Sequence, residues 1–349
     1  MRVLFIVPYP TYGPSNRFRV EQYLPYLDQK NISYCVRPFC NREFYFLLQK
    51  RSRYFKKFIY LVFFSFLRVI DLFRSLNYDV VFIHREAFPT KDCAFEWLFR
   101  RFSRKMIYDF DDAVFLKKTA KITGALRMSD GVIAGNGFLR NYAASLNKVV
   151  TVLPTCIDTD IYKPAAKKGV GGKVVIGWMG TPTTSEYLKE LKGVFTSLLE
   201  KYKNIEIKVT GGIADNFLSP GLIYKNWSLE NEVRDLQEFD IGIMPMPDND
   251  WTRGKCAFKI IQYMAVGIPS VASPVGMNLE VIQDGVNGFF ASNKKDWIDK
   301  LSLLIEDPDL RASVGKNGRR TVGERYSLKV MGPRFVEILE NVSQSKGFK

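Results

Sequence analysis

Two lysines and a glutamine between Gly254 and Gly267 have a spacing that suits anion binding. The two glycines predict the start and end of a helix, on which Lys255, Lys259 and Gln262 share one face. Cations near a helix N-terminus oppose the helix dipole. A bound phosphate removes that conflict, because lysines and backbone N–H groups then converge on it. A solvated lysine face on an amphipathic helix fits the same residues equally well.

Two further polar clusters follow predicted strands. His84, the only histidine in the chain, comes directly after the strand 79–83. Its residue type suits general acid–base work or contact with a sugar, although a histidine at a strand end is often only a satisfied polar group. A group of carboxylates follows the strand 106–108: Asp109, Asp111 and Asp112. An Asp-x-Asp pair at a strand end can hold a divalent cation that binds a nucleotide diphosphate, and it also faintly suggests a phosphoaspartate phosphatase.

The elements that must position these clusters alternate between strand and helix. A first series extends from the strand 2–7 to the strand 149–153, and a second begins at 174–180 and ends at 270–276. Open parallel sheets bind ligands at the carboxyl ends of their strands, where the polar clusters fall. The stretch 162–172, with its proline and glycines, is the only convincing linker. We therefore predict two Rossmann-like α/β domains.

Composition agrees with a two-domain enzyme. The chain has 349 residues, of which 46% are hydrophobic, and this length allows two full cores. The five cysteines are odd in number and lack C-x-x-C spacing, which favours a reducing compartment over disulfides or a zinc site. A nicotinamide-dependent oxidoreductase is disfavoured, because neither series has G-x-G-x-x-G after its first strand.

The positive charge is concentrated in the first half. Of the net +15, residues 1–165 account for +12, and residues 42–74 for +6. In that segment a basic stretch leads into the aromatic run 58–67, which is too short to cross a bilayer. Such a stretch is typical of a helix that lies on an anionic membrane, although a core helix with a basic rim is the alternative. Nucleic acid is not an expected partner, because no nucleic-acid module is recognisable.

The lysine-bearing helix lies between two short strands, and the turn 284–289 follows. This order resembles the nucleotide-sugar signature of retaining glycosyltransferases of the family-four type. The resemblance covers nearly the whole chain and implies the GT-B fold, with two Rossmann-like domains facing across a cleft. It implies an acceptor domain over 1–165, joined by the C-terminal helix 330–349, and a donor domain over 166–329.

The resemblance also implies an activity and a setting. The expected reaction moves a sugar from a nucleotide diphosphate donor to a membrane-associated glycan or lipid-linked acceptor. It is expected to proceed with retention, in bacterial surface-polysaccharide assembly. No cofactor or metal is expected, since lysines stand where a cation would otherwise neutralise the leaving group. The expected location is cytoplasmic, peripheral on the inner face of the plasma membrane.

Site residues follow from the same resemblance. His84, Lys255 and Lys259 are the expected catalytic residues, and Asp111 and Asp112 lie on the acceptor side. The expected donor-binding residues include both lysines and also Gly13, Pro14, Arg17, Gly180, Thr181, Trp227 and Gln262. Arg17 and Arg19 could contact phosphate as forks, and the 180–183 turn could offer backbone N–H groups.

One departure from the family pattern leaves a second function open. Many relatives have two glutamates eight positions apart in this region, where the chain has Gly254 and Gln262. Gln262 can still hydrogen-bond a ribose, but Gly254 has no side chain to contact a sugar hydroxyl. A non-catalytic member that binds nucleotide or membrane and scaffolds a polysaccharide assembly complex is therefore the alternative.

Overall fold

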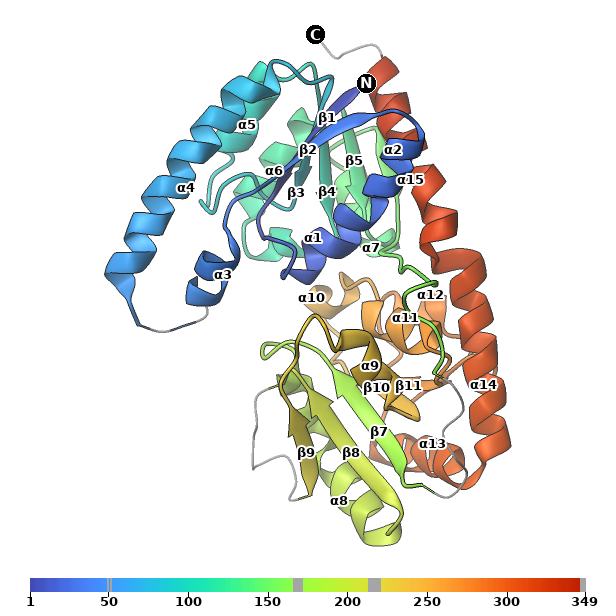
Figure 1. Ribbon diagram of the computed structural model, residues 1–349. Coiled ribbons are helices and arrows are strands. Elements are labelled where there is room, and N and C mark those ends of the chain that lie inside the picture. Colours follow the sequence, from blue (N-terminus) through green and yellow to red (C-terminus); the bar gives the residue numbers. More distant parts are fainter. Residues whose placement is uncertain (49, 51, 166–171, 213–220, 346–349) are drawn as a thin grey trace. The chain divides into compact units, whose positions relative to one another are not determined.

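The computed structural model describes residues 1–48, 50, 52–165, 172–212 and 221–345. These residues form two compact units (Figure 1). Unit 1 comprises Met1–Thr155 and Met331–Lys349, and unit 2 comprises Cys156–Val330. Each unit is built around its own parallel sheet with helices packed on it.

The sheet of unit 1 has the strand order β2-β1-β3-β4-β5-β6 in its described residues, and all neighbouring strands are parallel. The strands are β1 (Arg2–Val7), β2 (Ser33–Pro38), β3 (Val80–His84), β4 (Lys105–Phe110), β5 (Gly131–Ala134) and β6 (Val150–Val152). The central strands are largely apolar, and all their residues except Arg2 are buried, as expected for a parallel sheet covered on both faces.

The connections in unit 1 are helical. They are α1 (Pro14–Arg19), α2 (Leu24–Gln29), α3 (Arg42–Leu48), α4 (Tyr54–Ser75), α5 (Ala94–Phe102), α6 (Thr119–Met128) and α7 (Gly137–Ala144). The C-terminal helix α15 (Leu328–Gln344) also packs here through Phe335, whose ring stacks on Tyr23 at 4.3 Å and lies 6.3 Å from Phe5. The C-terminal helix is therefore part of the core of unit 1.

The sheet of unit 2 has the order β12-β11-β10-β7-β8-β9 in its described residues. Its strands are β7 (Val174–Met179), β8 (Ile205–Thr210), β9 (Leu222–Lys225), β10 (Ile241–Met244), β11 (Ser270–Ala272) and β12 (Phe289–Phe290). Its helices are α8 (Lys192–Lys201), α9 (Glu232–Gln237), α10 (Asp250–Arg253), α11 (Phe258–Ala265), α12 (Asn278–Val281), α13 (Lys294–Glu306) and α14 (Pro308–Thr321). Gly242 on β10 allows α11 to pack closely on the sheet, because a methyl group at this position would lie 2.4 Å from the Tyr263 ring.

The two units divide earlier in the chain than the boundary at 165/166 expected from the sequence. Residues 156–165 belong to unit 2 because they are held there. Ile157 is fully buried and pairs with Ser327, and the Tyr162 hydroxyl donates to Glu232. Part of the predicted linker, residues 166–171, lies outside the described residues.

The basic and aromatic segment of unit 1 forms α4, a helix of 22 residues. Only a narrow face is buried, and it packs on α3 through stacked rings, with Phe44 lying 5.2 Å from Tyr60 and 5.6 Å from Phe64. The opposite face is apolar and exposed, so the core-helix alternative is wrong for most of its length. Within the part of the chain that the structure describes, no helix is long and apolar enough to cross a membrane.

Candidate functional sites in the two units

The lysine-bearing helix of unit 2 begins later than the sequence predicted. Asn249 and Thr252 form a reciprocal capping box that starts the short helix α10, and Gly254 ends it. Ala257 then adopts the left-handed conformation at φ 51°, which breaks the chain direction before α11 begins at Phe258. Lys255 therefore lies before α11 and does not share a helical face with Lys259. Lys259 and Gln262, three residues apart, remain neighbours on α11.

Lys259 lies against the loop that follows β7. A methyl group on Gly180 would lie 2.8 Å from Lys259 Cε and 2.5 Å from Trp178 Cη2, so only glycine fits at that position. The Lys259 ammonium lies 5.4 Å from the centre of the Trp178 ring. The structure thus brings together Gly180 and Lys259, two residues that the sequence assigned to the donor.

The neighbouring loops contribute differently from what the sequence predicted. The N–H of Gly180 donates to the Thr210 carbonyl, and the N–H of Thr181 donates to Thr184 Oγ1 over 3.2 Å. These two N–H groups are already engaged, and the phosphate contact expected from the backbone of the 180–183 turn stays a prediction. Because Gly180 has no side chain, it leaves the space that the Lys259 side chain occupies.

Glu232, which sequence reasoning missed, connects two of the predicted donor residues. Trp227 Nε1 donates to Glu232 Oε2 over 2.9 Å, and Gln262 Nε2 donates to Glu232 Oε1 over 3.2 Å. The Glu232 carboxylate is buried and also accepts from the Tyr162 hydroxyl. Gln262 is therefore oriented by a carboxylate from α9. This contact joins residues thirty positions apart, and no local sequence pattern signals it.

Lys255 lies near an aromatic ring of its own. Its ammonium is 5.3 Å from the centre of the Trp251 ring, at the start of α10. Both lysines of the predicted diphosphate site therefore lie over tryptophan faces, Lys255 over Trp251 and Lys259 over Trp178. An indole face attracts a cation without neutralising its charge.

In unit 1 the register of the sheet places His84 directly beside Asp109, because β3 and β4 pair at these two residues. His84 Nδ1 lies 2.6 Å from Asp109 Oδ2, and both side chains are buried. Arg19 forms a buried ion pair with the same carboxylate and donates from Nε over 3.2 Å. Arg19 is therefore a structural partner of Asp109 and not the exposed phosphate fork that the sequence suggested.

Charge keeps Asp109 ionised. Burial by itself raises the pKa of the Asp109 carboxyl, but the positive charge of Arg19 and the hydrogen bond from His84 outweigh burial and leave the pKa below its ordinary value. An ionised carboxylate only accepts hydrogen bonds, so Nδ1 of His84 is the donor in this contact. Nε2 has no hydrogen-bond partner among the described residues and lies 4.0 Å from Asp111 Oδ1.

Arg85, which the sequence reading did not assign to the site, holds the two acceptor-side aspartates. It donates from Nε to Asp111 over 2.6 Å and from Nη2 to Asp112 over 2.5 Å. Its backbone is left-handed at φ 59°, and its N–H donates to the Asp109 carbonyl. Arginines thus accompany all three carboxylates of the cluster that sequence reasoning considered as a cation site.

The remaining predicted donor residues lie at the carboxyl end of β1 in unit 1. Gly13 precedes α1 and is closely packed, since a methyl group there would lie 2.5 Å from Tyr9 Cβ. Pro14 begins α1, and the Arg17 guanidinium lies 4.8 Å from the Phe18 ring. Gly13, Pro14 and Arg17 thus belong to unit 1, and the other predicted donor residues belong to unit 2.

Two units, each with a parallel sheet and helical connections, have the architecture of the GT-B fold that the sequence resemblance implied. The solved structure of HepE from Anabaena with UDP-glucose matches with a TM-score of 0.72 at 15% identity, over 98% of this chain and 100% of that chain. Residues 251–321, which include both lysines and Gln262, match the family model "Glycosyl transferases group 1". The resemblance to GT-B glycosyltransferases and the α/β GT-B fold are thereby confirmed.

Two curated bacterial relatives are also similar. The Campylobacter jejuni N,N'-diacetylbacillosaminyl-diphospho-undecaprenol alpha-1,3-N-acetylgalactosaminyltransferase is 23% identical over 59% of this chain and 57% of its own length. The Staphylococcus aureus capsular polysaccharide biosynthesis glycosyltransferase CapM is 22% identical over 50% of this chain and 48% of its own length. The chain thus spans about half the length of these two relatives.

Proposed function

We propose that the protein is a glycosyltransferase that moves a sugar from a nucleoside diphosphate donor to a lipid-linked or membrane-associated glycan. The observation that supports this most directly is the contact of Lys259 with Gly180 at the carboxyl end of β7, inside the donor-type sheet. Lys259 and Lys255 neutralise the departing diphosphate, and Trp227 and Gln262, oriented by Glu232, contact the nucleoside.

The acceptor belongs to unit 1 in this proposal. The side chain of Asp111, which is partly exposed beside the buried His84, can accept hydrogen bonds from sugar hydroxyls. Transfer proceeds with retention, as in the family that the chain resembles. Binding and positioning of the two substrates supply most of the rate enhancement, together with charge stabilisation of the diphosphate.

No metal takes part in the proposed reaction. Arg19 and Arg85 already supply positive charge to Asp109, Asp111 and Asp112. A divalent cation would have to displace these guanidinium groups.

The proposed setting is bacterial surface-polysaccharide assembly at the inner face of the plasma membrane. Its support is the similarity to the two bacterial relatives, one named for a diphospho-undecaprenol substrate and one for capsular polysaccharide. The exposed apolar face of α4 gives unit 1 a surface for peripheral contact with that membrane.

A panel of nucleotide sugars tests the activity. The protein is incubated with each donor and a lipid-linked acceptor extract, and nucleoside diphosphate release is followed. Release with one donor, together with an α-linked product from an α-linked donor by NMR, is the expected result. Binding of a nucleotide without turnover of any donor would favour the non-catalytic scaffold instead.

A further inference from the structure

The outward face of α4 is an uninterrupted apolar stripe. Six exposed side chains recur every three or four residues and so line one side of the helix: Phe55, Ile59, Val62, Phe66, Val69 and Phe73. Phe58 and Phe63, exposed at 62% and 53%, widen the stripe beyond a narrow coiled-coil seam. The charged residues between 58 and 73 are Arg68 and Asp71, and both are buried. A wide apolar face with buried charges suits hydrocarbon better than a second helix.

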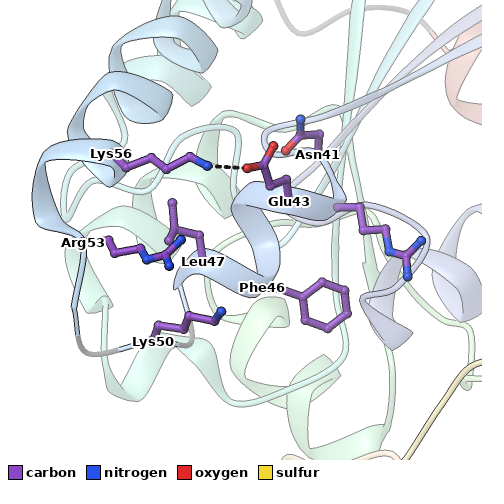
Figure 2. A pocket seen from close by; sticks show the side chains of 8 residues that line it. Asn41, Glu43, Phe46, Leu47, Lys50, Arg53 and Lys56 are labelled. Carbon is purple, nitrogen blue, oxygen red and sulfur yellow. Dashed lines mark hydrogen bonds and ion pairs between the residues drawn. The ribbon is translucent and has the colours of Figure 1, made fainter.

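A basic cavity lies at the N-terminal end of this stripe, between α3 and α4 (Figure 2). Its volume is about 540 Å³. Four cations and one carboxylate line it: Arg42, Lys50, Arg53, Lys56 and Glu43. Lys56 and Tyr60 both donate to Glu43 over 2.5 Å, so this carboxylate is already engaged. Lys50 and Arg53 have no ion-pair partner among the described residues, and the cavity therefore favours an anion.

Aromatic rings connect the cavity to the polar cluster of unit 1. Phe46 lines the cavity, and its ring centre lies 5.5 Å from Tyr45, which in turn lies 5.6 Å from Tyr9. Tyr9 follows β1 and Asp111 follows β4, so both lie at the carboxyl edge of the same parallel sheet. Phe46 is exposed and the two tyrosines are partly exposed, and such rings form a surface on which sugars can pack.

Three surfaces therefore follow one another in unit 1: apolar, cationic and aromatic. A glycan attached to a polyprenyl diphosphate has hydrocarbon, diphosphate and sugar in the same order. We propose that the cavity between α3 and α4 binds the diphosphate of such an acceptor, an inference that rests on the proposed function. The polyprenyl chain then enters the bilayer along α4, and the glycan extends over Phe46 and Tyr9 towards Asp111.

Vesicle flotation separates this ligand from anionic lipid in general. Phosphatidylcholine vesicles contain either a polyprenyl diphosphate or phosphatidylglycerol, matched in surface potential. The wild-type protein is expected to bind the first kind about 10-fold more tightly. The variant Lys50→Ser/Arg53→Ser should lose that preference, since it loses two charged hydrogen bonds. Equal binding of both vesicles by the wild-type protein would overturn the diphosphate assignment and indicate a general anionic-lipid surface.

A matched control has the same change in net charge. Arg140→Ser/Lys148→Ser removes two exposed cations of unit 1 from α7 and the segment after it, and its preference should remain that of the wild type. An equal loss in both double variants would contradict the cavity assignment. Nucleotide affinity, measured by calorimetry on the same variants, should be unchanged. If the protein turned over no donor, the proposed activity would be refuted. The vesicle assay would still test the diphosphate site, because it does not depend on turnover.

Discussion

The imidazole of His84 donates from Nδ1 to Asp109 over 2.6 Å, and this contact joins the ends of the neighbouring strands β3 and β4. Asp109 is held as a carboxylate by Arg19, so it accepts from Nδ1 and orients the ring. The same arrangement buries a charge pair in the centre of unit 1. The catalytic proposal and the stability of the unit thus depend on one carboxylate.

Replacement of this carboxylate should destabilise unit 1 strongly. Asp109→Asn leaves the buried Arg19 without its counter-ion, and removal of one partner of a buried ion pair costs about 3–5 kcal/mol of unfolding free energy. Urea denaturation followed by circular dichroism measures the change. Glu43→Gln, at an exposed ion pair in the same unit, is the control and should change stability little. Similar losses of unfolding free energy in both variants would show that the buried pair of Arg19 and Asp109 stabilises the unit no more than an exposed ion pair does.

The same pair predicts a loss of stability in acid. The pKa of Asp109 lies below its ordinary value of 3.8 in the folded protein, so its stabilisation is present above that value. As the pH falls through the lower, folded-state pKa, this contribution is lost. The double variant Arg19→Met/Asp109→Leu should therefore lose less unfolding free energy between pH 5 and pH 3 than the wild type. Parallel pH profiles of the two proteins would contradict the prediction.

Removal of either donor-site lysine should weaken nucleotide binding. Lys255→Ala and Lys259→Ala each lose a charged hydrogen bond to the diphosphate, which costs about 1–3 kcal/mol of binding free energy. Isothermal titration with the nucleoside diphosphate of the active donor measures it. Lys295→Ala, at an exposed ion pair with Asp299 on α13, should bind like the wild type. Wild-type affinity in both site variants would exclude the lysines as diphosphate ligands.

Catalysis should survive chelation. Because Arg85 accompanies Asp111 and Asp112, the reaction needs no divalent cation in our proposal. Turnover is measured after exhaustive dialysis against EDTA, with and without added Mg²⁺ or Mn²⁺. If activity vanished in EDTA and returned with a metal, this would contradict the prediction and indicate that the aspartates bind a metal ion.

The apolar face of α4 should be needed for membrane contact. Phe55→Ser and Phe66→Ser together remove two exposed rings, 78% and 64% accessible, without touching the buried face. The double variant should stay folded and show weaker co-sedimentation with anionic vesicles. High salt should weaken the wild type only in part, since salt screens the charges and not the apolar contact. Unchanged sedimentation of the variant would assign α4 to another partner.

The alternation of strands and helices was readable because buried parallel strands are short apolar runs. The strand 2–7 was predicted with the bounds that the structure shows, and the predicted strand 79–83 differs from β3 by one residue. The strands β2, β9 and β12 were missed. β2 and β9 are only partly buried edge strands, and β12 has only two residues, so none has a long apolar run. Among the described residues, local pattern thus identified the buried strands and missed three of the four edge strands, β6 being the exception.

The candidate residues were also readable in part, since lysines, aspartates and a histidine at strand ends are visible in the sequence. Their partners were decided by the tertiary structure. The register of β3 and β4 places His84 beside Asp109. Arg19, which lies ninety positions earlier in the chain on α1, contacts the same carboxylate. A left-handed Ala257 removes Lys255 from the helix that the glycines predicted. Sequence determined which groups are present and which strands carry them, whereas long-range packing decided which charges meet, because those contacts join residues far apart in the chain.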